Sequence, residues 1–221
     1  MKRVLAVFII FVIGVCAILY INYSFMKIKK LPVLSPCDVN PELYDTSLYR
    51  NCIGHKIKNF NLIDQLNRKV TLENLKDKIV IADFFFVSCP SICPLMTKNL
   101  KMVHDRFKNN TDILILSHTV WPEMDSVDIL FEYANRYNVN HDTWRFLTGK
   151  KKELYRMARK SYLVAPDLND RNFTHGSSAD FIHTENIVLV DTKQRIRGFY
   201  DGTDAEDLNT LLVDIESLMM Y

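Results

Sequence analysis

The sequence predicts an α/β domain with a mixed central sheet flanked by helices, preceded by an N-terminal transmembrane helix. Three observations support this fold class. Nearly continuous apolar stretches alternate with amphipathic helical patterns, and the last two strand patterns are separated only by the short turn TKQ. An uncharged apolar run of about 18 residues lies close to the start of the chain.

The first half of the domain begins with FNLIDQLNRKVTLENL, residues 60–75, whose alternation around QLNRK predicts a hairpin. IVIADFFFV, residues 79–87, is nearly all apolar, as expected of a strand buried on both faces. Apolar residues then recur at helical spacing over 93–107. ILILS, residues 113–117, predicts a second buried strand, and 126–137 an amphipathic helix.

The second half repeats this alternation. A short strand is expected at 143–149 and a helix at 151–162, KKELYRMARKSY. Residues 186–191 and 195–202 predict a terminal hairpin, and 205–220 a closing helix. Alternating strands and helices imply a central sheet with helices on both faces, and the hairpin makes that sheet mixed.

The apolar run VLAVFIIFVIGVCAILYI, residues 4–21, is long enough for a membrane-spanning helix. A cleaved signal peptide would have a shorter apolar region and small residues before the cleavage site, and neither is present. A lipoprotein would carry a small residue before the modified cysteine, whereas Val15 precedes Cys16. Residues 1–30 are therefore expected to form an uncleaved membrane anchor with its flank.

The charge of the chain excludes one class of function. The formal net charge is +2, but residues 1–30 hold five basic and no acidic residues, which leaves 23 basic against 26 acidic residues in the remainder. A nucleic-acid-binding protein would carry a basic patch on its folded domain. No such patch is evident along the chain, so we expect no nucleic-acid partner.

Basic residues flank the apolar run 4–21 on both sides, so they leave the orientation of the predicted membrane span open.

Residues 31–56 are rich in turn residues and predict a linker or irregular lead-in to a domain at 57–221. Cys37 and Cys52 lie within this segment, 15 residues apart. If the domain is exported, a disulfide between them is expected to contribute roughly 3 kcal/mol. The alternative is a pair of unbridged thiols.

The stretch FFFVSCPSICPLMTKNL, residues 84–100, places Cys89 and Cys93 where a predicted strand meets a predicted helix. Ligands of such sheets bind beyond the carboxyl ends of the strands. Prolines that directly follow both cysteines suit the first turn of a helix. Both sulfurs could then lie on one face, near a helix N-terminus that lowers thiol pKa.

Three interpretations of this pair remain open: two small buried residues, a redox dithiol, or part of a metal site. Redox dithiols on this architecture usually have two residues between the cysteines, and here there are three. A metal site would use the soft thiolates for copper or zinc and would need a histidine as well.

Six histidines are candidates for that additional ligand. His183 is favoured because it directly precedes the apolar strand 186–191, at a junction expected to face the cysteine loop. His118 ends the second strand, and His175 lies in a polar loop; both are weaker candidates. The remaining three are expected to be structural, with the first of them exposed on its helix: His104, His55 and His141.

Taken together, these residues resemble the Sco/SenC family of copper-handling, thioredoxin-like proteins. The resemblance covers roughly residues 55–215 and depends on CPSICP at 89–94, TVWPE at 119–123 and His183. It implies a thioredoxin-like fold that binds copper, as Cu(I) or Cu(II), through Cys89, Cys93 and His183.

The resemblance also implies a function and a location. Members of the family assist assembly of the copper centre of cytochrome c oxidase subunit II, either by delivering copper or by reducing cysteines of that subunit. The expected protein is thus a membrane-anchored metallochaperone rather than a turnover enzyme, acting on subunit II or another copper-site protein. Its soluble domain would lie on the exported side of the membrane, and the lack of an Arg- and Ser-rich transit segment favours a bacterial inner membrane over a mitochondrial one.

The sequence departs from the family pattern at three positions. Ser91 replaces an acidic residue inside the cysteine motif, Trp121 replaces the Asp of a DPE-like segment, and Asp180 lies three residues before His183 rather than next to it. Thioredoxin-type oxidoreductases also have a cis-proline before the strand that faces the dithiol, whereas FIHTEN contains none. This favours metal binding over the alternatives, a thiol-disulfide oxidoreductase acting on exported partners or a thiol peroxidase.

Overall fold

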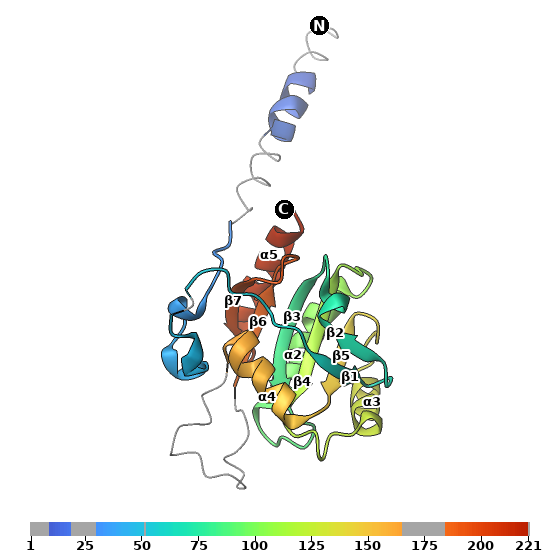
Figure 1. The fold of residues 1–221 in the computed structure, drawn as a ribbon. Helices are drawn as coiled ribbons and strands as arrows, with labels where there is room; N and C mark the ends of the chain where they lie inside the picture. Colours follow the sequence, from blue (N-terminus) through green and yellow to red (C-terminus); the bar gives the residue numbers. More distant parts are fainter. Residues whose placement is uncertain (1–8, 19–29, 51, 165–183, 221) are drawn as a thin grey trace, which may run out of the picture.

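The computed structural model describes residues 9–18, 30–50, 52–164 and 184–220. A seven-stranded sheet forms the centre of the domain, in the order β2-β1-β5-β4-β3-β6-β7 (Figure 1). Its strands are β1 (Asn61–Asp64), β2 (Lys69–Thr71), β3 (Ile79–Phe85), β4 (Ile113–Thr119), β5 (Trp144–Thr148), β6 (Asn186–Val190) and β7 (Ile196–Asp201).

The three central strands, β3, β4 and β5, are parallel, and the hairpins β1–β2 and β6–β7 join them antiparallel on either side. All seven residues of β3 and all seven of β4 are buried, which explains their apolar sequences. The predicted mixed sheet is confirmed. Because parallel strands point the same way, β3, β4 and β5 end at one edge of the sheet, which we call the carboxyl edge.

Helices cover both faces of the sheet (Figure 1): α2 (Ile92–Phe107), α3 (Val127–Arg136), α4 (Lys151–Met157) and α5 (Ala205–Met219). Successive side chains of a strand point to opposite faces, so Phe84 and Phe85 identify the two layers. Phe84 contacts Tyr162, which follows α4, with ring centroids 5.7 Å apart. Phe85 contacts Tyr133 of α3, whose hydroxyl hydrogen-bonds Thr97 of α2. Hence α4 covers one face, and α2 and α3 cover the other.

Local sequence determines where several helices begin and end. Ser126 caps α3 by accepting a hydrogen bond from the Ile129 N–H, and Asp204 caps α5 in the same way. The predicted helix 151–162 is divided in two, because α4 ends at Met157 and a π-helical turn, Ala158–Tyr162, continues it. Leu163, at φ 58°, ends that turn in the left-handed region.

The lead-in segment is irregular, as expected, but packs against the domain. Three short 3₁₀ helices occupy it, and Leu31, Tyr44 and Leu48 are buried in the core. A disulfide joins Cys37 to Cys52, with Cα atoms 5.1 Å apart.

At the N-terminus, residues 9–18 form an exposed helix. The helices in the described part of the chain include none with the length and apolarity needed to cross a membrane. The predicted span 4–21 extends beyond the described residues at both ends.

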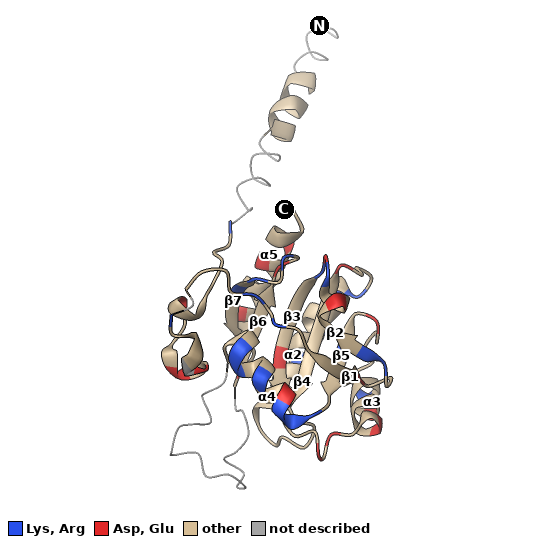
Figure 2. Cartoon of the chain, viewed as in Figure 1, with Lys and Arg blue, Asp and Glu red and all other residues tan. Residues whose placement is uncertain are grey.

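One expectation about the surface is wrong. Lys and Arg residues lie along α4 and on the chain segment beside it (Figure 2). The folded domain therefore does carry a basic patch. It was not evident along the chain because it combines segments almost a hundred residues apart, 56–58 and 150–160.

Candidate metal and thiol centre

Cys89 and Cys93 lie at the carboxyl edge, directly after β3. The chain turns after Phe85, with the Cys89 N–H donating to the Phe86 carbonyl at 3.2 Å, and α2 begins at Ile92. Cys89 is 6% exposed and Cys93 4% exposed, and neither forms a disulfide. Cys93 is the second residue of α2, whereas Cys89 lies just outside the helix, before its cap Ser91.

The two thiols differ in their tendency to ionise. Burial opposes ionisation of Cys89, but hydrogen bonds from the Cys93 thiol and from the backbone and hydroxyl of Ser91 outweigh it and lower the pKa of Cys89. The Ser91 hydroxyl lies 3.8 Å from the Cys89 sulfur. Burial, reinforced by the neighbouring Cys89, raises the pKa of Cys93 well above its ordinary value. The pair therefore holds one favoured thiolate and one protonated thiol, which donates to it.

A buried carboxyl group, which sequence reasoning missed, lies on the same face of the sheet. Asp83 is 1% exposed in β3, and burial raises its pKa to about 7. The Ser117 hydroxyl donates to Asp83 at 2.5 Å, and the Trp144 indole N–H donates to Ser117 at 2.9 Å. The charge of Asp83 contributes to the raised pKa of Cys93. The signal that could have revealed this residue is one acidic residue inside the apolar run IVIADFFFV.

The TVWPE segment after β4 packs against the cysteine loop. Asp125, 1% exposed, accepts hydrogen bonds from the Thr119 hydroxyl and from the Val87 N–H, the latter at 3.3 Å. Trp121 contacts Phe86 edge-on, with ring centroids 6.0 Å apart. Asp125 thus connects the end of β4 to the loop that carries Cys89.

The favoured third ligand, His183, lies outside the described residues, as does His175. Among the residues that the structure describes, no three His, Cys, Asp or Glu side chains gather so that they could hold a metal ion. The register of β6 on β3 pairs Val188 with Ala82, so β6 begins beside the end of β3, at the carboxyl edge.

The described histidines are buried or hydrogen-bonded within the domain. His118 is fully buried on the α4 face, where it stacks on Phe84, and burial lowers its pKa to about 4. Its Nδ1 lies 3.2 Å from the Asp83 carbonyl. The prediction that His104 is exposed is wrong: it is 3% exposed, because Trp144 and the chain at Asn140 cover that side of α2.

The other two histidines also make internal contacts. His55 Nε2 lies 2.9 Å from the Ser161 carbonyl, and His141 Nδ1 lies 3.1 Å from the Gln65 amide nitrogen. Their structural role was expected.

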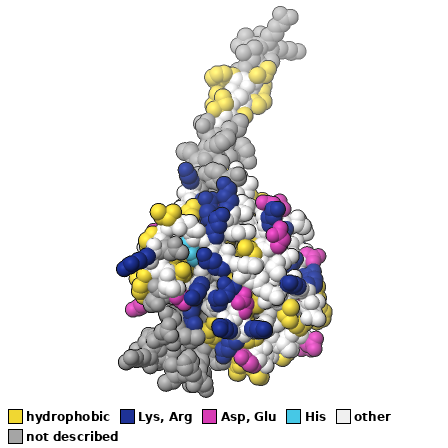
Figure 3. Space-filling model, viewed as in Figure 1, with side chains coloured by type: hydrophobic (Ala, Val, Ile, Leu, Met, Phe, Trp, Pro, Cys, Tyr) yellow, Lys and Arg dark blue, Asp and Glu magenta, His cyan; other side chains and the backbone are white. Residues whose placement is uncertain are grey.

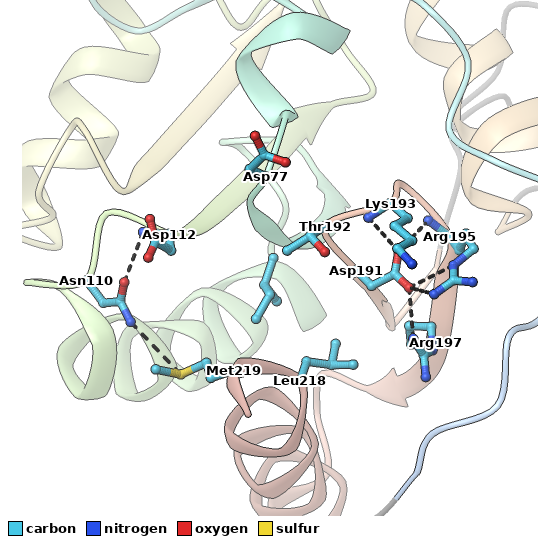
Figure 4. A pocket seen from close by; sticks show the side chains of 11 residues that line it. Asp77, Asn110, Asp112, Asp191, Thr192, Lys193, Arg195, Arg197, Leu218 and Met219 are labelled. Carbon is cyan, nitrogen blue, oxygen red and sulfur yellow. Dashed lines mark hydrogen bonds and ion pairs between the residues drawn. The ribbon is translucent and has the colours of Figure 1, made fainter. Parts of the chain in front are cut away.

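A cavity of about 290 Å³ lies at the opposite edge of the sheet, where β3 starts and β6 ends (Figure 4). The Asp191 carboxylate forms ion pairs there with Arg195 at 2.7 Å and with Arg197 at 2.8 Å. Asp77 and Asp112 line the far wall. This cavity is separated from the cysteines by the length of β3.

The SCO1/SenC family model matches residues 53–220. The SCO1 protein homolog of Bacillus subtilis is 29% identical over 170 residues, which cover 75% of this chain and 83% of the relative. A SCO2-like protein of Rickettsia felis is 32% identical over 155 residues, 69% of this chain and 73% of the relative.

Solved structures agree with these relatives. BsSco, described as a member of the Sco family of cytochrome c oxidase assembly proteins with a disulfide switch, superimposes with a TM-score of 0.63 at 28% identity, covering 76% of this chain and 95% of that one. Arabidopsis thaliana ScoI with copper bound gives a TM-score of 0.56 at 26% identity, covering 74% and 98%. The mixed α/β domain thus has the thioredoxin-like Sco fold, and the chain belongs to the SCO1/SenC family.

Proposed function

We propose that this protein binds copper through Cys89, Cys93 and His183 and assists assembly of the copper centre of cytochrome c oxidase. The observation that carries the proposal is the pair of buried thiols at the carboxyl edge, one with a lowered and one with a raised pKa. Copper-bound structures of ScoI from Arabidopsis and of other Sco proteins support the choice of metal.

The donor set suits Cu(I), because thiolates and imidazole are soft ligands. Binding would release the proton of Cys93, whose raised pKa makes affinity depend on pH. Oxidation of both cysteines to a disulfide would abolish binding, so redox state would control copper loading. His183 would complete the site, since it precedes Thr184 and β6 begins at the carboxyl edge.

We further propose that residues 4–21 anchor the protein in a bacterial inner membrane, with residues 57–221 exported as the copper-binding domain. The Cys37–Cys52 disulfide supports this side of the membrane, since disulfides persist in oxidising compartments.

A Cu(I) competition titration of the reduced protein tests the ligand set. We expect one tight equivalent in the parent and at least about tenfold weaker binding in His183→Ala, because one of three ligands is lost. His141→Ala, which removes a histidine hydrogen-bonded elsewhere in the domain, is the matched control. Equal affinity in parent and His183→Ala would exclude His183 as a ligand.

The second candidate function is reduction of disulfides in exported partners. The unequal thiols favour it, since a low-pKa Cys89 could attack a disulfide and Cys93 could then resolve the mixed disulfide. Absence of tight Cu(I) binding in the parent, with a mixed disulfide trapped in Cys93→Ser, would make this the working function.

A further inference from the structure

A band of basic side chains, which we call the basic face, runs along α4 and the neighbouring chain segment (Figure 3). Lys152, Arg156 and Lys160 follow each other at intervals of four residues along α4 and the π-helical turn after it, and none of the three is buried, whereas Leu154 and Met157 are. The basic face consists of these three residues together with Lys56, Lys58 and Lys150.

Hydrogen bonds hold the two segments of the basic face together. The Arg156 guanidinium donates to the Asn59 carbonyl at 2.5 Å, and the Lys58 N–H donates to the Ser161 hydroxyl at 3.1 Å. These contacts place Lys56 and Lys58 beside Arg156 and Lys160, so the charges form one continuous surface.

Most of this charge has no ion-pair partner among the residues that the structure describes. Arg156 pairs with Glu153 and Lys160 with Asp45. The four other lysines have no ion-pair partner in the described part of the chain: Lys56, Lys58, Lys150 and Lys152. After residue 30 the chain has 23 basic and 26 acidic residues, so the basic face is a local concentration of positive charge on a domain with a slight acidic excess. A local concentration of like charge costs self-repulsion and attracts partners of opposite sign.

The basic face begins at the carboxyl edge. β5 is parallel to β4, and β4 to β3, so Thr148 at the end of β5 lies at the same edge as the cysteine loop. Lys150 follows two residues later and starts the basic face. A partner bound along the basic face would therefore reach the cysteines.

Exposed apolar side chains at the carboxyl edge indicate what kind of partner fits. Leu95, in the first turn of α2, is 44% exposed, and Met124, in the loop after β4, is 53% exposed. Apolar contacts beside a charged rim are typical of protein interfaces. A bilayer on this face would also cover the carboxyl edge and block access of a partner protein to the cysteines.

We propose that the basic face is the docking surface for an acidic protein that exchanges copper or electrons with Cys89 and Cys93. This proposal rests on the proposed function and adds the charge of the partner to it. The basic face guides and orients the partner, and Leu95 and Met124 contact it next to the thiols.

Charge reversal tests the docking surface separately from copper binding. The full-length protein in detergent is compared with a variant carrying Lys56→Glu, Lys58→Glu, Lys150→Glu and Lys152→Glu. The matched control changes four other exposed lysines by the same charge: Lys69→Glu, Lys76→Glu, Lys98→Glu and Lys108→Glu. Binding is measured to poly-L-glutamate as the acidic polypeptide probe, to phosphatidylglycerol-containing vesicles and to a double-stranded DNA oligonucleotide.

We expect the parent and the control to bind polyglutamate similarly, with affinity that falls as salt rises, and the basic-face variant to bind at least about tenfold more weakly. Equal binding by the two variants would overturn the proposal, and so would binding that depends on the basic face only with vesicles or DNA. The Cu(I) stoichiometry of all three proteins is measured in parallel. A parent that binds polyglutamate through this face but no Cu(I) would contradict the copper function and leave the docking surface supported.

Discussion

The pKa of Asp83 is determined by the surroundings of its side chain. Burial between apolar strands raises the pKa of its carboxyl group from 3.8 to about 7, although the hydrogen bond from the Ser117 hydroxyl acts in the opposite direction. The folded protein therefore holds this proton more tightly than the unfolded chain does. The stability that this difference in pKa contributes is fully present at pH values below the pKa of the carboxyl group in the unfolded chain. It is lost as the pH rises towards 7.

Asp83→Asn should remove this dependence while keeping an oxygen that accepts from Ser117. Relative to the parent, the free energy of unfolding of the variant should increase by up to about 4 kcal/mol between roughly pH 4 and pH 8. Urea unfolding of both proteins at the two pH values measures this difference. A difference that is constant with pH would show that Asp83 does not titrate in this range.

At this scale the sequence predicted where Cys89 and Cys93 lie but not all their surroundings. Cys89 and Cys93 were recognisable because an apolar strand, two prolines and a helical pattern meet there. The burial of His104 was not predictable, because it depends on Trp144 and Asn140 from later in the chain.

Among the elements, the loop between β4 and α3 matters most for the site. The Asp125 carboxylate accepts hydrogen bonds from the Val87 N–H and from the Thr119 hydroxyl. One side chain therefore holds both the cysteine loop and the start of the TVWPE segment in place. Without that carboxylate, the Val87 N–H would lose a buried acceptor.

Asp125→Ala should lower the free energy of unfolding by about 1–3 kcal/mol and weaken Cu(I) binding, because the loop carrying Cys89 is then less well positioned. Asp128→Ala, which changes an acidic residue in the first turn of α3, is the control. Denaturant unfolding and Cu(I) competition measure the two effects. Unchanged copper affinity in Asp125→Ala would limit Asp125 to a structural role.

The order of strands and helices agreed with the sequence prediction because each element has its own apolar period. The π-helical turn Ala158–Tyr162 did not, since its register depends on packing of Tyr162 against Phe84 and His118 from the sheet. The basic face likewise follows from tertiary structure, which brings 56–58 beside α4.

At the scale of the whole molecule, the Cys37–Cys52 disulfide links two residues of the lead-in segment that lie 15 positions apart in the sequence, and so closes a loop. Tyr44 and Leu48, inside that loop, are buried against the domain, so order in the loop and stability of the domain are coupled.

Replacing Cys37 and Cys52 together by serine should lower the free energy of unfolding by up to about 3 kcal/mol, because the unfolded chain regains the freedom of that loop. The Cu(I) stoichiometry should stay the same. Cys16→Ser, which removes an exposed free thiol, is the matched control. Thermal unfolding under oxidising conditions measures the change, and equal stability of all three proteins would contradict it.

Arg197 fixes the place where the chain enters the domain. Its guanidinium donates to the carbonyls of Leu31 and Pro32, at 2.5 and 2.7 Å, beside the cavity that Met219 of α5 also lines. The chain thus enters and leaves the domain at the same pole (Figure 1), whereas the cysteines follow the end of β3, at the carboxyl edge. A fusion partner or a sensor surface attached at either end of the domain would therefore lie opposite the cysteine loop, with the length of the domain between them.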